Sequence, residues 1–302
     1  MSGAAGVEET YSSIEESSRL LDVPCSRDNV LPILTTFRES LPEAVIVNSM
    51  ATGKRHAGEL DYSFTIPAPH GDPYVKALAN GLVEATDHPV GTLLADVQEH
   101  CSTGGFAVDC GVVAGFQKAW LFFALDDLPG LTRLADIPSM PRSLAENADF
   151  FSSRGLDDKV TMIGIDYQSK TINLYFGRFA PEILEPKSVV AMLRDLGLPE
   201  PSQEVLEFAQ QSFSIYVTLS WDSSKIDRIC FAVITPDAAA LPSRLHPDVA
   251  KFATNAPFAY DGHRILVYGV TFSPRGEYYK VGAYYQMTDQ TRKLLVAFDA
   301  IK

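Results

Sequence analysis

The stretch "FSIYVTLSWDSSKIDRICFAVI", residues 213–234, decides the fold because it holds two apolar strands joined by a short polar turn. Successive side chains of a strand point to opposite sides. In the second strand Arg228 shares one face with Cys230 and Ala232, while the alternate face carries Ile229, Phe231 and Val233. The stretch therefore predicts a β-hairpin that is largely buried on both faces and carries an arginine on one of them. A buried guanidinium needs a partner.

Similar pairs of strands recur along the chain. The five pairs are residues 42–50 with 59–67, 105–113 with 116–124, 159–167 with 171–179, 213–221 with 226–234, and 264–272 with 277–286. They recur roughly every 50 to 60 residues, which lies within the range of repeat architectures. Helical patterns are expected outside the pairs at residues 72–85, 89–101, 141–155, 186–197, 203–211, 247–256 and 290–301. We expect an α+β fold in a single domain over residues 1–302: a ten-stranded antiparallel β-barrel of five αββα units inside a ring of α-helices.

The strand faces predict a polar lumen. One face of nearly every strand is aliphatic, and the other carries polar and aromatic side chains. For an isolated strand the polar face would lie in solvent, but in a closed barrel under helices the aliphatic faces pack outward and the polar faces line the lumen. Arg228 then points into a cavity. The lumen-facing polar residues are Lys118, Arg228 and Lys280 as cations, Ser63, Asn173 and Tyr216 as hydrogen-bonding groups, and Asp61 as an acid.

These residues indicate an anionic ligand. Three cations and one carboxylate leave a surplus of positive charge, for which a diphosphate is the natural counterpart. The aromatic residues Trp120, Tyr175, Tyr216 and Tyr284 share the lumen and would line an isoprenoid chain and shield an allylic carbocation, although aromatic side chains also serve as plain barrel filling. Asp61 would hold Mg²⁺ against diphosphate oxygens, with Asp109 as a candidate second ligand through a water molecule.

Composition restricts the partners. A net charge of −13 disfavours nucleic acid and anionic membranes. The N-terminal residues lack the features of a signal peptide, and no apolar run approaches a membrane span. The four cysteines include no CxxC pair, so we expect neither disulfides nor a zinc site. We expect a soluble, cytoplasmic, monomeric protein. The sequence contains no GxxxxGK[ST], HExxH, GxSxG or DDxxD motif.

The sequence resembles the soluble bacterial aromatic prenyltransferases of the ABBA, or PT-barrel, family, and within it especially the magnesium-dependent hydroxynaphthalene geranyltransferase branch. Colinear blocks such as "ELDYSFTIP", "HGDPY", "IPSMP", "INLYFGRF", "SFSIYVTLSW", "KIDRICFAVI" and "EYYKVGAYYQMTD" carry the resemblance from end to end. It implies an αββα barrel that binds a prenyl diphosphate beside an aromatic substrate. Position by position, it implies that Asp61 binds magnesium beside Ser63, and that the diphosphate contacts are Lys118, Asn173, Tyr216, Arg228 and Lys280.

The resemblance also implies a wall for the prenyl chain and the aromatic substrate. The matching positions are Val47, Ser49, Met162, Tyr175, Phe213, Ser214, Ala232, Gly282, Tyr284 and Leu294. Phe213 and Ser214 are adjacent, so both reach the lumen only at a bulge or at the rim. Four further wall positions depart from the branch: Thr161 replaces a glutamine, Trp120 replaces a tyrosine, and Gln290 with Thr291 replaces an aliphatic residue followed by glutamine. The aromatic acceptor therefore stays open.

The leading hypothesis is electrophilic aromatic substitution in secondary metabolism, with a geranyl or dimethylallyl group transferred from its diphosphate to an electron-rich phenolic or hydroxynaphthalene-type ring. The cations and magnesium would stabilise the departing diphosphate. One alternative is a non-catalytic barrel that carries an isoprenoid or a polyketide, although it has no evident use for three lumenal cations. Another alternative is prenyl transfer to an indole-type acceptor. Chain length depends on the depth of the lumen, and the resemblance favours geranyl.

Overall fold

Ten antiparallel β-strands close into a barrel in the order β1-β10-β9-β8-β7-β6-β5-β4-β3-β2 in the computed structural model, which describes residues 5–158, 160–238, 247–288 and 291. Each strand pairs with its neighbours in sequence, and β1 pairs with both β2 and β10 to complete the ring. The strands are β1 (Ile46–Ala51), β2 (Asp61–Pro67), β3 (Thr103–Gly111), β4 (Gly115–Phe123), β5 (Val160–Asp166), β6 (Thr171–Phe176), β7 (Ser214–Ser220), β8 (Arg228–Thr235), β9 (Leu266–Ser273) and β10 (Gly276–Gln286).

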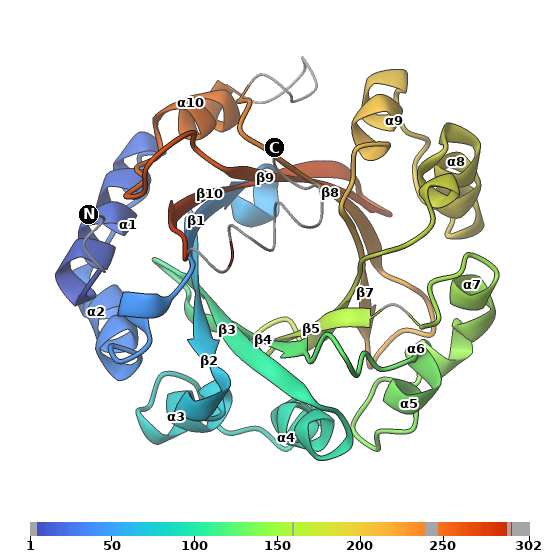
Figure 1. Cartoon of the computed structure of the whole chain (residues 1–302), viewed down its shortest axis with the longest axis horizontal. Coiled ribbons are helices and arrows are strands. Elements are labelled where there is room, and N and C mark those ends of the chain that lie inside the picture. The colour runs from blue at the N-terminus through green and yellow to red at the C-terminus, as the bar shows by residue number, and fades with distance from the viewer. Residues whose placement is uncertain (1–4, 159, 239–246, 289–290, 292–302) are drawn as a thin grey trace.

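The helices form a ring outside the barrel (Figure 1). They are α1 (Val7–Leu20), α2 (Arg27–Thr36), α3 (Pro73–Ala79), α4 (Val90–His100), α5 (Leu131–Ala135), α6 (Ser143–Glu146), α7 (Ala148–Ser152), α8 (Pro186–Asp195), α9 (Gln203–Ala209) and α10 (Pro247–Asn255). Short 3₁₀ turns occur at Leu41–Glu43, Lys54–His56, Ala68–His70 and Pro181–Leu184. The expected barrel with surrounding helices is confirmed.

The hydrophobic core lies between the barrel and this ring, as the alternation predicts. In β2 the side chains of Tyr62, Phe64 and Ile66 are buried outward, whereas the intervening Ser63 and Thr65 are only partly covered and line the lumen. Removing apolar surface from water is the main favourable term in folding. The aliphatic faces therefore fix which side of each strand is the inside of the barrel.

The N-terminal helices α1 and α2 and the short α5 were not expected from the sequence. The buried face of α1 includes Thr10, Ser13 and Ser17 in place of a continuous apolar stripe. Asn48 of β1 satisfies part of this polar face, because its side-chain nitrogen donates to the Ser17 hydroxyl oxygen at 3.0 Å. Because α1 buries hydroxyl groups, it lacks the regular spacing of apolar residues by which a helix is recognised in a sequence.

Other expected helix limits need correction. The helix expected over 72–85 ends at Ala79, because Asn80 caps it and Gly81 follows with a φ of +68° that favours glycine. The helix expected over 141–155 is divided into α6 and α7. The helix expected over 290–301 lies outside the described residues.

The two ends of the barrel differ. Connections of two to nine residues join the members of each strand pair at one end, from residues 274–275 to residues 52–60, and we call it the hairpin end. Longer segments, most of them helical, join successive pairs at the opposite end, which we call the helix end. Because all pairs are antiparallel, the starts of β2, β4, β6, β8 and β10 lie together at the hairpin end.

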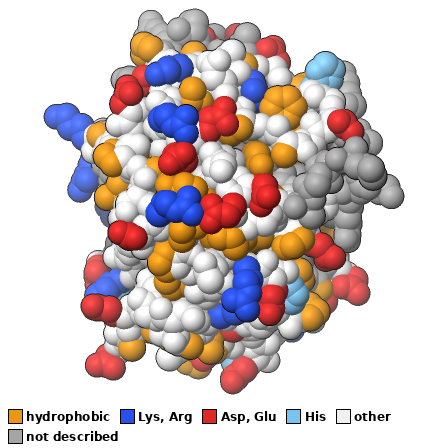
Figure 2. Space-filling view, turned by 90° about the vertical axis from the view of Figure 1, so that its left-hand side faces the viewer, with side chains coloured by type: hydrophobic (Ala, Val, Ile, Leu, Met, Phe, Trp, Pro, Cys, Tyr) orange, Lys and Arg blue, Asp and Glu red, His pale blue; other side chains and the backbone are white. Residues whose placement is uncertain are grey.

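The outer surface carries mixed charge. On the face that turns α1 and α2 outward, Figure 2 shows basic and acidic side chains interspersed. Two of the pairs are Arg19 with Glu15 at 2.9 Å and Arg27 with Glu8 at 2.8 Å. These two cations are thus neutralised locally. Within the described ranges, every helix is too short or too polar to cross a membrane.

Candidate active site

The barrel encloses a cavity of about 2200 Å³ that runs along its axis. Every described residue that the sequence predicted for the site lines this cavity. These are Val47, Ser49, Asp61, Ser63, Asp109, Lys118, Trp120, Thr161, Met162, Asn173, Tyr175, Phe213, Ser214, Tyr216, Arg228, Ala232, Lys280, Gly282 and Tyr284. The predicted Gln290 and Leu294 lie outside the described residues.

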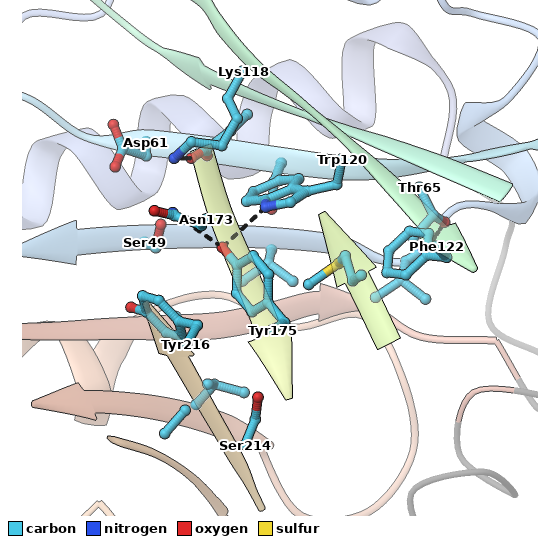
Figure 3. Close-up of a pocket in the computed structure, with 18 of the residues that line it drawn as sticks. Ser49, Asp61, Thr65, Lys118, Trp120, Phe122, Asn173, Tyr175, Ser214 and Tyr216 are labelled. Atoms are coloured by element: carbon cyan, nitrogen blue, oxygen red, sulfur yellow. Dashed lines mark hydrogen bonds and ion pairs between the residues drawn. The ribbon is translucent and has the colours of Figure 1, made fainter. Parts of the chain in front are cut away.

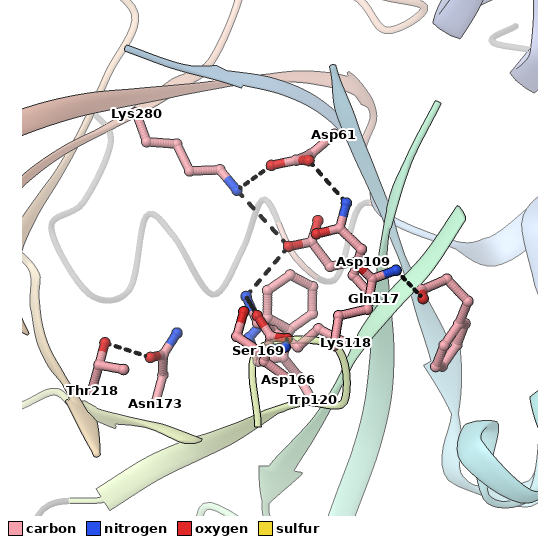
Figure 4. A network of polar contacts seen from close by, with 12 residues as sticks. Asp61, Asp109, Gln117, Lys118, Trp120, Asp166, Ser169, Asn173, Thr218 and Lys280 are labelled. Atoms are coloured by element: carbon pink, nitrogen blue, oxygen red, sulfur yellow. Dashed lines mark hydrogen bonds and ion pairs between the residues drawn. The ribbon is translucent and has the colours of Figure 1, made fainter. Parts of the chain in front are cut away.

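Ionic side chains gather at the hairpin end (Figure 4). The Lys280 ammonium lies 3.1 Å from a carboxylate oxygen of Asp61 and 3.8 Å from one of Asp109. The Lys118 ammonium lies 3.6 Å from Asp109 and 4.0 Å from Asp166. Asp109 thus lies between the two lysines, and the five strands β2 to β5 and β10 are linked by one ionic network.

The charge balance of the site differs from the sequence prediction of a cationic surplus. Asp166 and Asp109 join Asp61 in the ionic network, so its three carboxylates equal in number the predicted cations Lys118, Arg228 and Lys280. Asp166 was overlooked because it is the last residue of β5, next to a turn. Its Oδ1 also accepts the backbone N–H of Ser169 at 2.7 Å, which anchors that turn.

The network shifts the pKa values of its members. Burial opposes ionisation of Asp61, but the charge and hydrogen bond of Lys280, with help from Lys118, outweigh it and hold the pKa below its ordinary value. At Asp109 burial dominates, and the pKa is raised despite the two lysines. Burial alone would lower the pKa of Lys118 and of Lys280, yet the carboxylates, Asp109 above all, raise both. Both lysines therefore stay protonated at neutral pH.

Arg228 is the cation that the network leaves out. It begins β8 opposite Thr218, lines the cavity and is partly buried, but its guanidinium forms no hydrogen bond or ion pair with any described residue. A partly buried guanidinium with five N–H donors is costly without an acceptor. A bound ligand would therefore supply the acceptor that the Arg228 guanidinium lacks.

A hydrogen-bonded chain crosses the middle of the cavity (Figure 3). The Thr218 hydroxyl donates to Oδ1 of Asn173 at 2.7 Å, and Nδ2 of Asn173 donates to the Tyr175 hydroxyl oxygen at 3.4 Å. The indole N–H of Trp120 donates to the same oxygen at 3.0 Å. The Tyr175 and Tyr216 rings lie 4.7 Å apart at 35°, so two aromatic faces border the ionic end.

Gly164 gives the Trp120 indole its space. A Cβ atom at position 164 would lie 2.6 Å from both Cδ1 and Nε1 of Trp120 and 3.4 Å from the Tyr175 ring. Real Cβ contacts of 2.6 Å do not occur in close-packed proteins. The glycine thus lets the indole lie against β5 within reach of the Tyr175 hydroxyl.

Two bulges and one rim position explain exceptions to strict alternation. The register of β3 and β4 shifts beside Gln117, so that both Gln117 and Lys118 face the cavity. The register of β5 shifts beside Thr161, which likewise joins Met162 in the lining. Phe213 precedes β7 at the helix end and is 37% exposed, which makes it a rim residue beside Ser214.

Further lining residues escaped the sequence prediction. Gln117 donates to Oδ1 of Asp61 at 3.3 Å, and only the bulge brings it inward. His56 lies in the turn between β1 and β2, lines the cavity and stacks on Tyr278 with ring centroids 5.2 Å apart. Glu59 in the same segment accepts backbone N–H groups of Val113 and Ala114 at 3.0 and 2.8 Å. These contacts depend on loop conformation, for which the sequence offers no periodic signal.

The carboxylates at the hairpin end suit a hard divalent cation. Among the described residues, Oδ1 of the buried Asp109 has no hydrogen-bond partner, and Oδ1 of Asp61 has only the long bond from Gln117. Mg²⁺ commonly uses one or two carboxylates and completes its shell with water and phosphate oxygens. The described residues contain no group of three or more His, Cys, Asp or Glu side chains placed to hold a metal by themselves. The donor set thus fits Mg²⁺ bound together with an anionic ligand.

Comparisons with known proteins agree with this geometry. The profile of the family described as "Aromatic prenyltransferase Orf2" matches residues 6–297. The 5,10-dihydrophenazine-1-carboxylate 9-dimethylallyltransferase of Streptomyces anulatus is 45% identical over 98% of this chain and 99% of its own. The flaviolin linalyltransferase of Streptomyces virginiae is 45% identical over 97% and 96%, and a furaquinocin biosynthesis prenyltransferase of a Streptomyces strain is 44% identical over 96% and 93%.

Proposed function

The chain belongs to the aromatic prenyltransferase Orf2 family and is an enzyme that transfers prenyl groups, and from this premise we propose its substrates and mechanism. It transfers a geranyl or dimethylallyl group from the diphosphate to an electron-rich phenolic or hydroxynaphthalene-type ring, in secondary metabolism. The observation that carries the proposal is Arg228, a cation that has no hydrogen-bond or ion-pair partner among the described residues and that faces the aromatic-walled cavity of a closed barrel.

The diphosphate binds at the hairpin end. Arg228 offers a forked pair of N–H donors that matches phosphate oxygens, and Lys118 and Lys280 offer point charges. Asn173 and Tyr216 lie on the strands between these cations and add hydrogen-bond donors. Negative charge develops on the diphosphate as the C1–O bond breaks, so donors already in place lower the barrier.

Charge balance supports a need for Mg²⁺. The three lysine and arginine charges are matched by Asp61, Asp109 and Asp166, so that the protein alone supplies no net positive charge to a multiply charged anion. Asp61, and Asp109 directly or through water, would hold the ion. Bound there, Mg²⁺ would neutralise charge on the leaving diphosphate as a Lewis acid.

The prenyl chain and the acceptor ring occupy the remaining cavity. A volume of about 2200 Å³ exceeds the roughly 300 to 1,000 Å³ of a typical small-molecule pocket, so two substrates fit side by side. The faces of Tyr175, Tyr216 and Trp120 stabilise a developing allylic cation and exclude water from it. The ring carbon attacks C1, and its proton then leaves to water or a nearby hydroxyl, for which no strong base is required.

The test is product formation. Purified protein is incubated with geranyl or dimethylallyl diphosphate and a dihydroxynaphthalene, with magnesium or with chelator, and adducts are measured by mass spectrometry. We expect an adduct of one prenyl group that disappears with chelator. An adduct that persists with chelator removes the metal from the proposal. Binding of the donor without an adduct on phenolic, indole or phenazine rings contradicts the proposed acceptor class and favours a carrier.

The proposal includes a monomeric, cytoplasmic enzyme. In the closed barrel each strand has two neighbours, so no strand edge invites pairing with a second copy. All four cysteines are free, which suits a reducing compartment. Light scattering coupled to size exclusion tests the oligomeric state, and a dimer mass at micromolar concentration would contradict it.

A further inference from the structure

The Tyr175 hydroxyl has an unusual set of partners. The Trp120 indole nitrogen, 3.0 Å away, can only donate. The Asn173 side-chain nitrogen donates from 3.4 Å, in an orientation that the Thr218 hydroxyl fixes by donating to Oδ1 of the same amide. The phenolic oxygen therefore accepts from two N–H groups, and its own hydrogen points away from both.

No described residue accepts that hydrogen. On the ionic side, Lys118 and Lys280 lie close enough to Tyr175 for its phenol to contribute to raising their pKa values. Ammonium groups have no acceptor. Gly164 leaves the space in which the Trp120 indole lies against the Tyr175 hydroxyl, and the Lys118 ammonium lies 5.5 Å from the centre of the indole ring. The O–H group is therefore a donor aimed at a ligand that Lys118 and Lys280 also attract.

We propose that Tyr175 donates a hydrogen bond to the diphosphate oxygen that leaves C1 of the prenyl donor, and that Trp120 is the positioning residue that directs it. This inference rests on the proposed function. In the reaction the C1–O bond breaks heterolytically, and both electrons remain on the departing oxygen. Tyr175 stabilises the developing negative charge by donating a hydrogen bond, and it transfers no proton.

The indole sets the direction of this donor. If the phenolic hydrogen rotated toward Trp120, it would meet the indole N–H hydrogen and be repelled. Trp120 therefore keeps the phenolic hydrogen directed toward the proposed diphosphate site. Preorganised donors aimed at developing charge are the more effective ones, because they need no reorganisation during the reaction. Replacing the indole by a ring without N–H releases the hydroxyl to rotate.

The experiment measures inorganic diphosphate binding by calorimetry, without turnover. The variants are Tyr175→Phe, Trp120→Phe and the double variant, and the matched control is Trp221→Phe, which loses an indole bond to the Ser139 carbonyl outside the cavity. Tyr175→Phe should weaken binding about tenfold to a hundredfold, as for loss of a hydrogen bond to a charged group. Trp120→Phe should weaken it less, and the double variant should equal Tyr175→Phe.

The kinetic counterpart uses saturating acceptor. Tyr175→Phe should lower kcat about a hundredfold, as for loss of one donor to developing negative charge, with little change in KM for the acceptor. If the acceptor KM rises instead while diphosphate affinity is unchanged, the hydroxyl faces the acceptor and the proposal is wrong.

Two outcomes separate the parts of the proposal. Additive losses in the double variant show that Trp120 acts independently and overturn its positioning role. If Trp120→Phe unfolds, replacement of the indole by its benzothiophene isostere removes only the N–H group and repeats the test. A wild-type protein that forms no prenylated product, yet binds diphosphate in a Tyr175-dependent way, contradicts the proposed function while retaining the Tyr175 donor.

Discussion

Replacing Arg228 with methionine separates structural from functional use of this cation. The guanidinium has no hydrogen bond or ion pair with any described residue. Its removal therefore leaves no orphaned carboxylate, and methionine fills a similar volume. We expect the free energy of unfolding to change by less than about 1 kcal/mol.

The same substitution should be severe for catalysis. A hydrogen bond to a charged group contributes about 1.5 to 3 kcal/mol, and an arginine fork makes two of them with a phosphate. Loss of both raises the barrier by about 3 to 6 kcal/mol, or about 10² to 10⁴ in kcat/KM. The loss should appear with donors of any prenyl length, because the proposal places Arg228 at the diphosphate and not along the prenyl chain.

The assay pairs chemical denaturation with steady-state kinetics, and Lys280→Met is the matched control. Lys280 serves Asp61 at 3.1 Å and Asp109 at 3.8 Å, so its removal leaves two carboxylates short of a cation. Breaking a buried pair from one side typically costs about 3 to 5 kcal/mol. Near-normal turnover of Arg228→Met combined with a comparable loss of stability would refute the assignment and make Arg228 a structural cation.

Three further predictions use the same cavity. Gly164→Ala should destabilise the fold by about 1 to 3 kcal/mol and shift tryptophan fluorescence, because the new Cβ meets the Trp120 indole at 2.6 Å; unchanged fluorescence would contradict this packing. The raised pKa of Lys280 gives stability that is present below its ordinary pKa of 10.5 and is lost as pH rises toward the folded value. Lys280→Met should therefore flatten the decline of the free energy of unfolding above pH 10.5 by about 1.4 kcal/mol per pH unit. Equal slopes in both proteins would exclude this linkage. Asp61→Asn should abolish the gain in diphosphate affinity that magnesium gives the wild type, measured by calorimetry, and a gain that persists would assign the ion to other ligands.

Alternation of side chains carried most of the prediction from sequence. A period of two, together with five repeated strand pairs, was sufficient to identify the barrel and to place residues such as Asn173 and Tyr216 in the lumen. Burial on one face fixes that assignment, because a shift by one residue would expose the aliphatic side. The same rule failed at Gln117 and Thr161, where bulges insert an extra residue.

The ionic network could not be predicted from the sequence because it depends on register between strands. Lys118 meets Asp109 and Asp166 only because β4 pairs with β3 on one side and β5 on the other at matching levels. Lys280 meets Asp61 across the closure of the barrel by β1, which links residues far apart in the chain. Periodicity assigns a face to each residue but not a level along the barrel axis, so the neutral charge balance was missed.

Level along the axis also separates the two chemical tasks of the site. Lys118 and Phe122 line the cavity from the same strand, four residues apart, and a strand rises about 3.3 Å per residue. Phe122 thus lies roughly 13 Å along the strand from Lys118, which is beyond direct contact with the charges of the ionic end. Substitutions near Phe122 should therefore hardly disturb the charges that release diphosphate. Stabilisation of the leaving group and selection of the ring and chain are accordingly independent functions of opposite ends of one barrel.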